Sequence, residues 1–126
     1  MAGHNPTLIK NYAAGAAVAA RRIVIHGSAD GLVVQGAGAT AALIGITTEV
    51  AAASGERCDV IKAGIADVEF GGSVSRGGPI TSDSVGRAVA ASPGAGANAY
   101  IIGFAEVDGA SGDIGQVFIA PGRIQG

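Results

Sequence analysis

The chain has 126 residues and a formal net charge of −2, and only 14 % of its residues are charged. This balance argues against direct nucleic-acid binding, which needs a basic surface, and no apolar run is long enough to span a membrane. The single cysteine, Cys58, excludes an internal disulfide and a thiolate metal cluster. With 22 glycines, three phenylalanines, two tyrosines and no tryptophan, the core must be light. We therefore expect stabilisation by self-association or by a partner surface.

The first 21 residues form an unusual segment. It contains no acidic residue, and after Tyr12 it has almost no large side chain before the arginines. Such a segment cannot fold alone, so we predict an extended N-terminal arm over residues 1–21 that orders against a partner. The predicted contact residues are the head of the arm and the two arginines at its end: Asn5, Pro6, Thr7, Leu8, Ile9, Lys10, Asn11, Tyr12, Arg21 and Arg22.

Residues 22–126 are predicted to form one β-rich domain. β-Branched and alternating apolar runs between glycine-rich turns indicate strands, which we place at 22–26, 32–35, 42–48, 57–62, 65–70, on both sides of a turn within 79–89, at 99–107 and at 114–120. We expect the last strand to stop at Pro121. Because no amphipathic helix separates the strands, the predicted fold class is all-β: a small antiparallel β-sandwich or barrel-like domain.

No catalytic, cofactor-binding or metal-binding residues are expected. The two histidines, His4 and His26, lie far apart in the sequence and outside any metal-ligand spacing. Cys58 occupies a strand position and is expected to be an inert core thiol. Asp67 and Glu69 share one face of a predicted strand at a spacing that a glycosidase could use, although solvated strand faces commonly carry such pairs.

Four groups of segments have a distinctive order and spacing: Tyr12–Val18 with Arg21–Val24, Gly55–Val60 with Gly64–Val68, Gly71–Val74 with Arg76–Asp83 and Gly86–Val89, and Ile102–Ala105 with Gly112–Val117 and Pro121–Gly122. Each group alone contains only residues that are common in turns and strands, so no single group is specific. Together they cover nearly the whole chain, which resembles the capsid cement, or head decoration, proteins of tailed bacteriophages. Cys58 departs from the family pattern, where an aliphatic residue such as valine is expected.

The resemblance implies a small β-rich protein that forms homotrimers on the outside of an icosahedral phage head. Its partner would be the major capsid protein, contacted at three-fold and quasi-three-fold sites, and its role would be to stabilise the shell against DNA pressure. It would be made in the bacterial host cytoplasm and reside on the outer capsid surface of the virion. The family has no catalytic residues or cofactors, and its N-terminal arm corresponds here to about Ala2–Ala20.

Two other functions stay open from the residues alone. A ligand- or carbohydrate-binding β-sandwich module would stack sugars on surface aromatics, whereas the aromatic residues of this chain are mostly in phase with core positions: Tyr12, Phe70, Tyr100, Phe104 and Phe118. A small hydrolase would use Asp67 with Glu69, or Cys58. A trimeric mass in solution favours the cement protein, and a monomeric mass favours the alternatives.

Overall fold

Nine β-strands build residues 5–126, the part of the chain that this computed structural model describes. No helix occurs among these residues, and the predicted all-β fold class is confirmed. The strands are β1 (Asn5–Ala14), β2 (Ile23–His26), β3 (Leu32–Gln35), β4 (Gly45–Thr47), β5 (Arg57–Glu69), β6 (Pro79–Ser82), β7 (Ala88–Ala90), β8 (Asn98–Ala105) and β9 (Ile114–Gln125).

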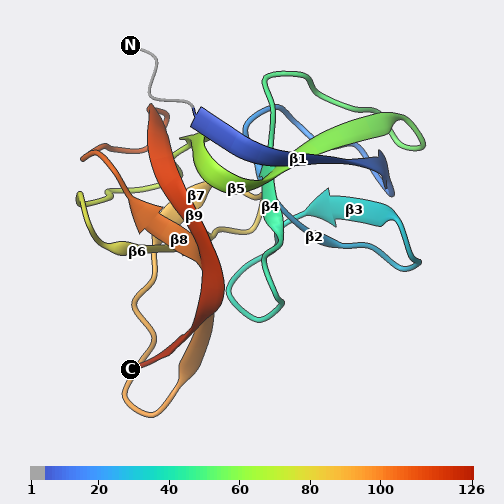
Figure 1. The fold of residues 1–126 in the computed structure, drawn as a ribbon. Helices are drawn as coiled ribbons and strands as arrows, with labels where there is room; N and C mark the ends of the chain where they lie inside the picture. Colours follow the sequence, from blue (N-terminus) through green and yellow to red (C-terminus); the bar gives the residue numbers. More distant parts are fainter. Residues whose placement is uncertain (1–4) are drawn as a thin grey trace.

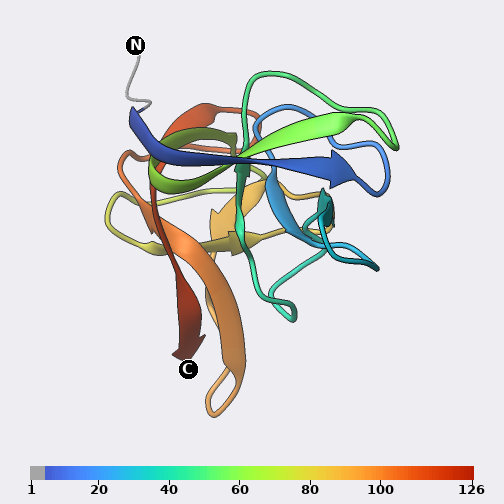
Figure 2. The same cartoon turned by 45° about the vertical axis from the view of Figure 1, so that its right-hand side comes forward.

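All nine strands belong to one mixed, mostly antiparallel sheet in the order β1-β3-β2-β4-β5-β9-β8-β6-β7. β1 pairs in parallel with β3 and also antiparallel with β5, so β1, β3, β2, β4 and β5 close into a ring. The other four strands continue the sheet from β5, and the start of β8 and the end of β9 project together away from the body (Figures 1 and 2). One half of the molecule is therefore barrel-like.

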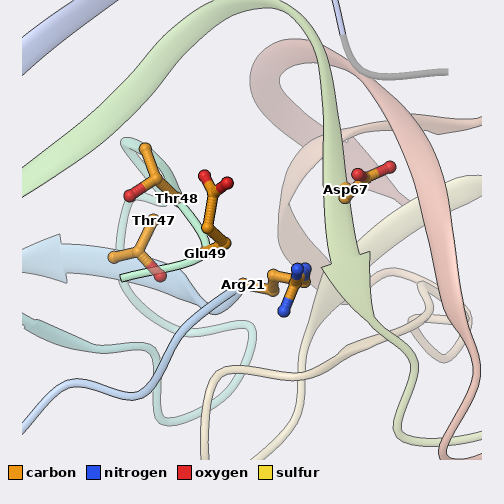
Figure 3. Close-up of a pocket in the computed structure, with 5 residues that line it drawn as sticks. All are labelled: Arg21, Thr47, Thr48, Glu49 and Asp67. Atoms are coloured by element: carbon orange, nitrogen blue, oxygen red, sulfur yellow. The ribbon is translucent and has the colours of Figure 1, made fainter. Parts of the chain in front are cut away.

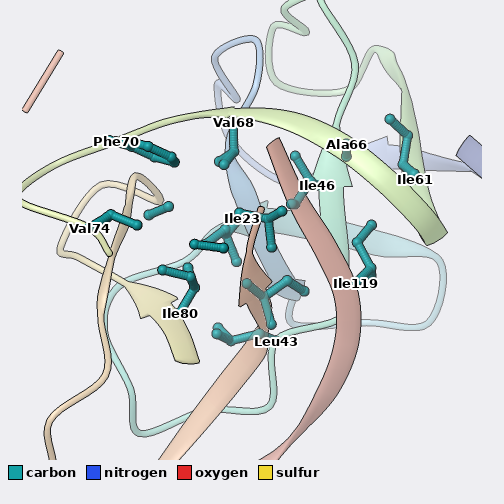
Figure 4. Packing of buried hydrophobic residues seen from close by; sticks show 14 residues of the cluster. Ile23, Leu43, Ile46, Ile61, Ala66, Val68, Phe70, Val74, Ile80 and Ile119 are labelled. Atoms are coloured by element: carbon teal, nitrogen blue, oxygen red, sulfur yellow. The ribbon is translucent and has the colours of Figure 1, made fainter. Parts of the chain in front are cut away.

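Two apolar cores stabilise this arrangement. The smaller core is formed by the ring and its loops: Tyr12, Ala14, Val18, Val24, Val33, Ala52, Cys58 and Val60. The larger core packs β2, β4 and β5 against β6, β8 and β9, and its largest fully buried side chain is Phe70 (Figure 4). Because β5 contributes to both cores, this strand ties the two halves of the molecule together.

β5 is one strand of 13 residues, whereas the sequence predicted separate strands at 57–62 and 65–70. Gly64 lies between the two predicted strands with a φ of +94°, a backbone region open to glycine. β1 passes so close that a Cβ at this position would overlap the carbonyl oxygen of Asn5. Glycine thus lets β5 continue past this point while β1 lies against it (Figure 1).

β9 passes through Pro121 and ends at Gln125, so the predicted strand end was wrong. Pairing with β5 ends at Phe118, and beyond that residue only β8 borders β9. The β8–β9 register also shifts between Ile101 and Gly103. Pro121 lies at this bulge, on a part of β9 whose other edge pairs with no strand of the described chain. Its missing N–H therefore removes no hydrogen bond between strands, and the proline is tolerated.

Candidate functional site

The predicted contact residues of the arm lie mostly on β1, which is paired with β5 of the same chain. The antiparallel pairing joins residues 5–13 to residues 57–65, with two register shifts. The division of the chain into an arm of residues 1–21 and a domain of residues 22–126 stays a prediction, and residues 1–4 lie outside the described part. Any partner of the arm would therefore meet a strand that already belongs to the sheet.

The side chains of β1 divide into an exposed and a buried set. Leu8 and Ile9 are 55 % and 48 % exposed, whereas Tyr12 is only 4 % exposed. Pro6 is half-buried, and the remaining exposed side chains are Asn5, Thr7, Lys10 and Asn11. Leu8 and Ile9 are each an exposed apolar side chain of the kind that a partner can cover.

Tyr12 and Asn11 fix β1 to its own domain. The Lys62 ammonium donates a hydrogen bond of 2.9 Å to the Tyr12 hydroxyl. The Lys10 nitrogen lies 5.3 Å from the centre of the Tyr12 ring, within the range of a cation–π interaction. The Asn11 amide donates a hydrogen bond of 2.9 Å to Asp59. Tyr12, predicted as a contact residue, is therefore an internal anchor in this structure.

The second edge of β1 is largely open. One edge pairs with β5, and on the other edge β3 pairs only with Ala13 and Ala14. Within the described chain, no strand pairs with this second edge along residues 5–12. Its backbone N–H and C=O groups can therefore pair with a strand from another chain.

Arg21, before β2, has a φ of +56°, which is uncommon for any residue but glycine. Its N–H donates to the Thr48 carbonyl at 2.9 Å, and its carbonyl accepts from the Glu69 N–H at 3.1 Å. Its side chain lines a cleft of about 50 Å³ (Figure 3); the other lining residues are Thr47, Thr48, Glu49 and Asp67. This volume admits a few water molecules and is far smaller than a ligand pocket.

Arg22 is engaged inside the protein and is only 17 % exposed at its side chain. Its guanidinium lies 3.1 Å from a Glu69 oxygen and donates to the Val85 carbonyl at 3.1 Å. Arg87 lies 3.9 Å from the other Glu69 oxygen and donates to Asp83 at 2.9 Å. The network joins the start of β2, the end of β5 and the β6–β7 turn. A contact of Arg22 with a partner stays a prediction.

Asp83 organises the β6–β7 turn. Its carboxylate accepts hydrogen bonds from the N–H groups of Val85 at 2.9 Å and Arg87 at 2.8 Å. Burial alone would raise the pKa of Asp83, but these backbone hydrogen bonds and the Arg87 guanidinium outweigh burial and lower the pKa below its ordinary value. The ionised carboxylate is therefore the form that stabilises the turn.

The Asp83→Asn variant is expected to lose about 1–3 kcal/mol of unfolding free energy at pH 7. Because the folded pKa is lowered, the stabilisation is present above the ordinary aspartate pKa of about 3.9 and is lost as the pH falls through the folded value. Urea denaturation at pH 7 and about pH 3 should show the difference from wild type shrinking in acid. An Asp30→Asn variant, in an exposed turn, is the control. An equal difference at both pH values would contradict this account.

The residues considered for catalysis make contacts within the fold. Burial raises the pKa of the Cys58 thiol, and the nearby charge of Asp59 raises it further. Cys58 is 2 % exposed, so its predicted place in the core is confirmed. Asp67 accepts a hydrogen bond of 2.8 Å from Gln116, and Glu69 belongs to the arginine network. Across the described residues, no three His, Cys, Asp or Glu side chains gather as metal ligands, and no helix is long and apolar enough to cross a membrane.

The aromatic side chains are expected to be mostly in phase with core positions, but two of the five are exposed. Phe104 and Phe118 lie opposite each other on β8 and β9 and are 39 % and 46 % exposed. The strand expected at 99–107 is apolar on both faces, so its sequence gives no sign that Phe104 points outward. Gln116 lies in phase with Phe118, and the buried Val117 lies between them. This alternation is the signal that could have placed Phe118 on the outer face.

The fold has a counterpart among solved structures. It is similar to the crystal structure of the N base of head fiber gp8.5 in bacteriophage phi29, with a TM-score of 0.67 and 14 % sequence identity over 94 % of this chain and 98 % of that chain. By sequence, no protein family and no curated protein matches the chain. The resemblance to the cement proteins therefore stays a prediction. What the two structures share is a fold, and the base of a phage head fiber is one protein that has it.

Proposed function

We propose that this protein is a non-enzymatic structural protein of a bacteriophage head, a cement protein that binds the outer surface of the shell. The observation that carries the proposal is the likeness in fold, over almost the whole of both chains, to the base of a phage head fiber. The segments quoted above for the cement proteins support it independently. The major capsid protein is the proposed partner, at three-fold and quasi-three-fold sites.

The open edge of β1 is the proposed capsid contact. Residues 5–12 offer backbone groups to a strand of the shell, and Leu8 and Ile9 offer apolar surface beside them. A free arm would lose about 1–2 kcal/mol of conformational entropy per ordered residue. β1 is already ordered against β5, so most of that cost is met in folding rather than in binding.

Self-association into a trimer completes the proposal. The light core favours further burial through association, and a three-fold site on a shell is matched by a three-fold partner. Three β1 edges on one trimer would also bind with avidity, because the second and third contacts form at high effective concentration. The protein would act on the virion surface after synthesis in the host cytoplasm.

Co-sedimentation with undecorated heads of the phage that encodes the protein tests the proposal. Purified protein should pellet with the heads in saturable amounts, and light scattering should give the mass of a trimer. Absence of the protein from the pellet at micromolar concentration would refute the proposed function. If the protein is a monomer in solution and binds heads as single copies, the proposed capsid binding is retained and the proposed trimer is refuted.

A Leu8→Ser/Ile9→Ser variant should bind heads about thirtyfold more weakly than wild type. Each side chain is about half exposed, so covering the exposed part is worth about 1 kcal/mol per residue. Val50→Ser removes a side chain that is 68 % exposed in the β4–β5 loop and serves as the matched control. Equal affinity of the two folded variants in the co-sedimentation assay would remove β1 from the capsid contact.

A further inference from the structure

Four apolar side chains form a continuous row across four strands. Ile65 on β5 lies opposite Phe118 on β9, Phe118 lies opposite Phe104 on β8, and Phe104 lies opposite Pro79 on β6. Residues directly opposite each other in a sheet point to the same face. Both phenylalanines are exposed, and Ile65 and Pro79 are half-buried. We call these four residues the apolar row.

The apolar row lies on the outer face of the sheet. The residues one position along the same strands point to the opposite face, and that face packs into the core. Ala66, Val117 and Ala105 are opposite one another one step along these strands and are at most 3 % exposed. Their side chains belong to the larger core. The row is therefore a surface feature that packing within the chain does not require.

The row continues onto β1. Asn5, at the start of β1, lies opposite Ile65, so the register connects the apolar row to the strand proposed to meet the shell. A groove of about 280 Å³ lies at this junction; its lining residues are Asn5, Ile65, Glu106, Val107 and Gln116. One flat partner could therefore cover the start of β1 and the apolar row together.

Acidic and neutral residues border the row. The next register positions on its face hold Asp67 opposite Gln116, followed by Glu69 opposite Ile114. The exposed Glu106 donates its backbone N–H to the Gln116 carbonyl. Glu69 is paired with Arg22 and Arg87, and Asp67 accepts a hydrogen bond from Gln116. The exposed carboxylate at this border is therefore that of Glu106. If the apolar rows of three copies met at a symmetry axis, their Glu106 carboxylates would be brought together, which disfavours self-contact through this face.

We propose that the apolar row is the part of the domain that lies on the capsid shell, against an apolar surface of a shell subunit that also carries lysine or arginine side chains. The inference rests on the proposed function and adds the face and the chemistry of its contact. It makes the capsid interface a continuous surface from the start of β1 to Pro79. Glu106 then lies at its border, where it pairs with a basic group of the shell.

The test is a Phe104→Ser/Phe118→Ser variant, compared with wild type and Val50→Ser in co-sedimentation with undecorated heads. We expect at least tenfold weaker binding by the double variant, with an unchanged mass by light scattering. Glu106→Lys, at an exposed position beyond β8, should bind at least threefold more weakly, with Glu106→Gln between it and wild type. The Glu106 variants keep the proposal testable if the double variant fails to fold.

Three results would overturn the inference. Wild-type affinity of the folded double variant, or of Glu106→Lys, would remove this face from the capsid contact. Loss of the trimeric mass in either variant would assign the face to contacts between copies. Failure of wild type itself to bind heads would refute the proposed function, and that result is distinct because it requires no variant.

Discussion

Replacing Tyr12 with alanine is expected to lower the free energy of unfolding by about 3–5 kcal/mol, the range for loss of a buried aromatic ring. The ring is 4 % exposed and belongs to the core of the β1–β5 ring of strands. The variant also loses the hydrogen bond from Lys62 and the cation–π contact with Lys10. Urea denaturation followed by circular dichroism measures the loss.

The matched control is Tyr12→Phe, which keeps the ring in the core. It removes only the hydroxyl, so we expect a loss of about 1 kcal/mol. A loss below about 1 kcal/mol for Tyr12→Ala would mean that β1 does not pack on its own domain in solution. The arm would then be free, and the proposed capsid contact would have to include the cost of ordering it.

Gly103→Ala is expected to cost at least about 3 kcal/mol, because overpacking a closed backbone forces the chain to shift. Gly103 lies at the β8–β9 register shift, and a Cβ there would overlap the Phe118 carbonyl oxygen and lie 2.9 Å from the Ala120 nitrogen. Backbone atoms cannot rotate away as a side chain does. The expected result is a large fall in the urea midpoint, with disruption of the pairing that places Phe104 opposite Phe118.

Gly122 offers a control on the same pair of strands. A Cβ at this position would meet nothing within 4 Å, so Gly122→Ala should change the free energy of unfolding by no more than about 0.5 kcal/mol. The two variants add the same methyl group to the same two-stranded unit. Similar losses for both would show that the close approach at Gly103 does not govern the β8–β9 pairing.

Local patterns were sufficient to predict most of the strands. The strands predicted at 22–26 and 32–35 correspond to β2 and β3, which pair as a hairpin, and a hairpin with so short a turn depends mainly on neighbouring residues. The pairing of β1 with β5 could not be predicted in this way. It brings Tyr12 opposite Cys58, and nothing in the sequence near either residue specifies so distant a partner. An alanine- and glycine-rich segment without its own core was therefore interpreted as an arm for another chain.

The candidate site was predicted only in part. Exposed Leu8 and Ile9 agree with a contact surface on β1, whereas the inward positions of Tyr12 and Arg22 depend on partners from β5 and the β6–β7 turn. The apolar row was missed because its members come from four strands. A row across a sheet can be recognised only when the strand register is known. Gln116, in phase with Phe118, was the one local indication that Phe118 points outward.

Image reconstruction of undecorated heads incubated with the purified protein tests the central claim most directly. The account predicts density for this fold on the outer surface at three-fold and quasi-three-fold positions. The open edge of β1 should lie beside a strand of the shell, and Phe104 and Phe118 should face the shell. Heads that show no added density at saturating protein, or density anywhere but the outer surface, would contradict the account.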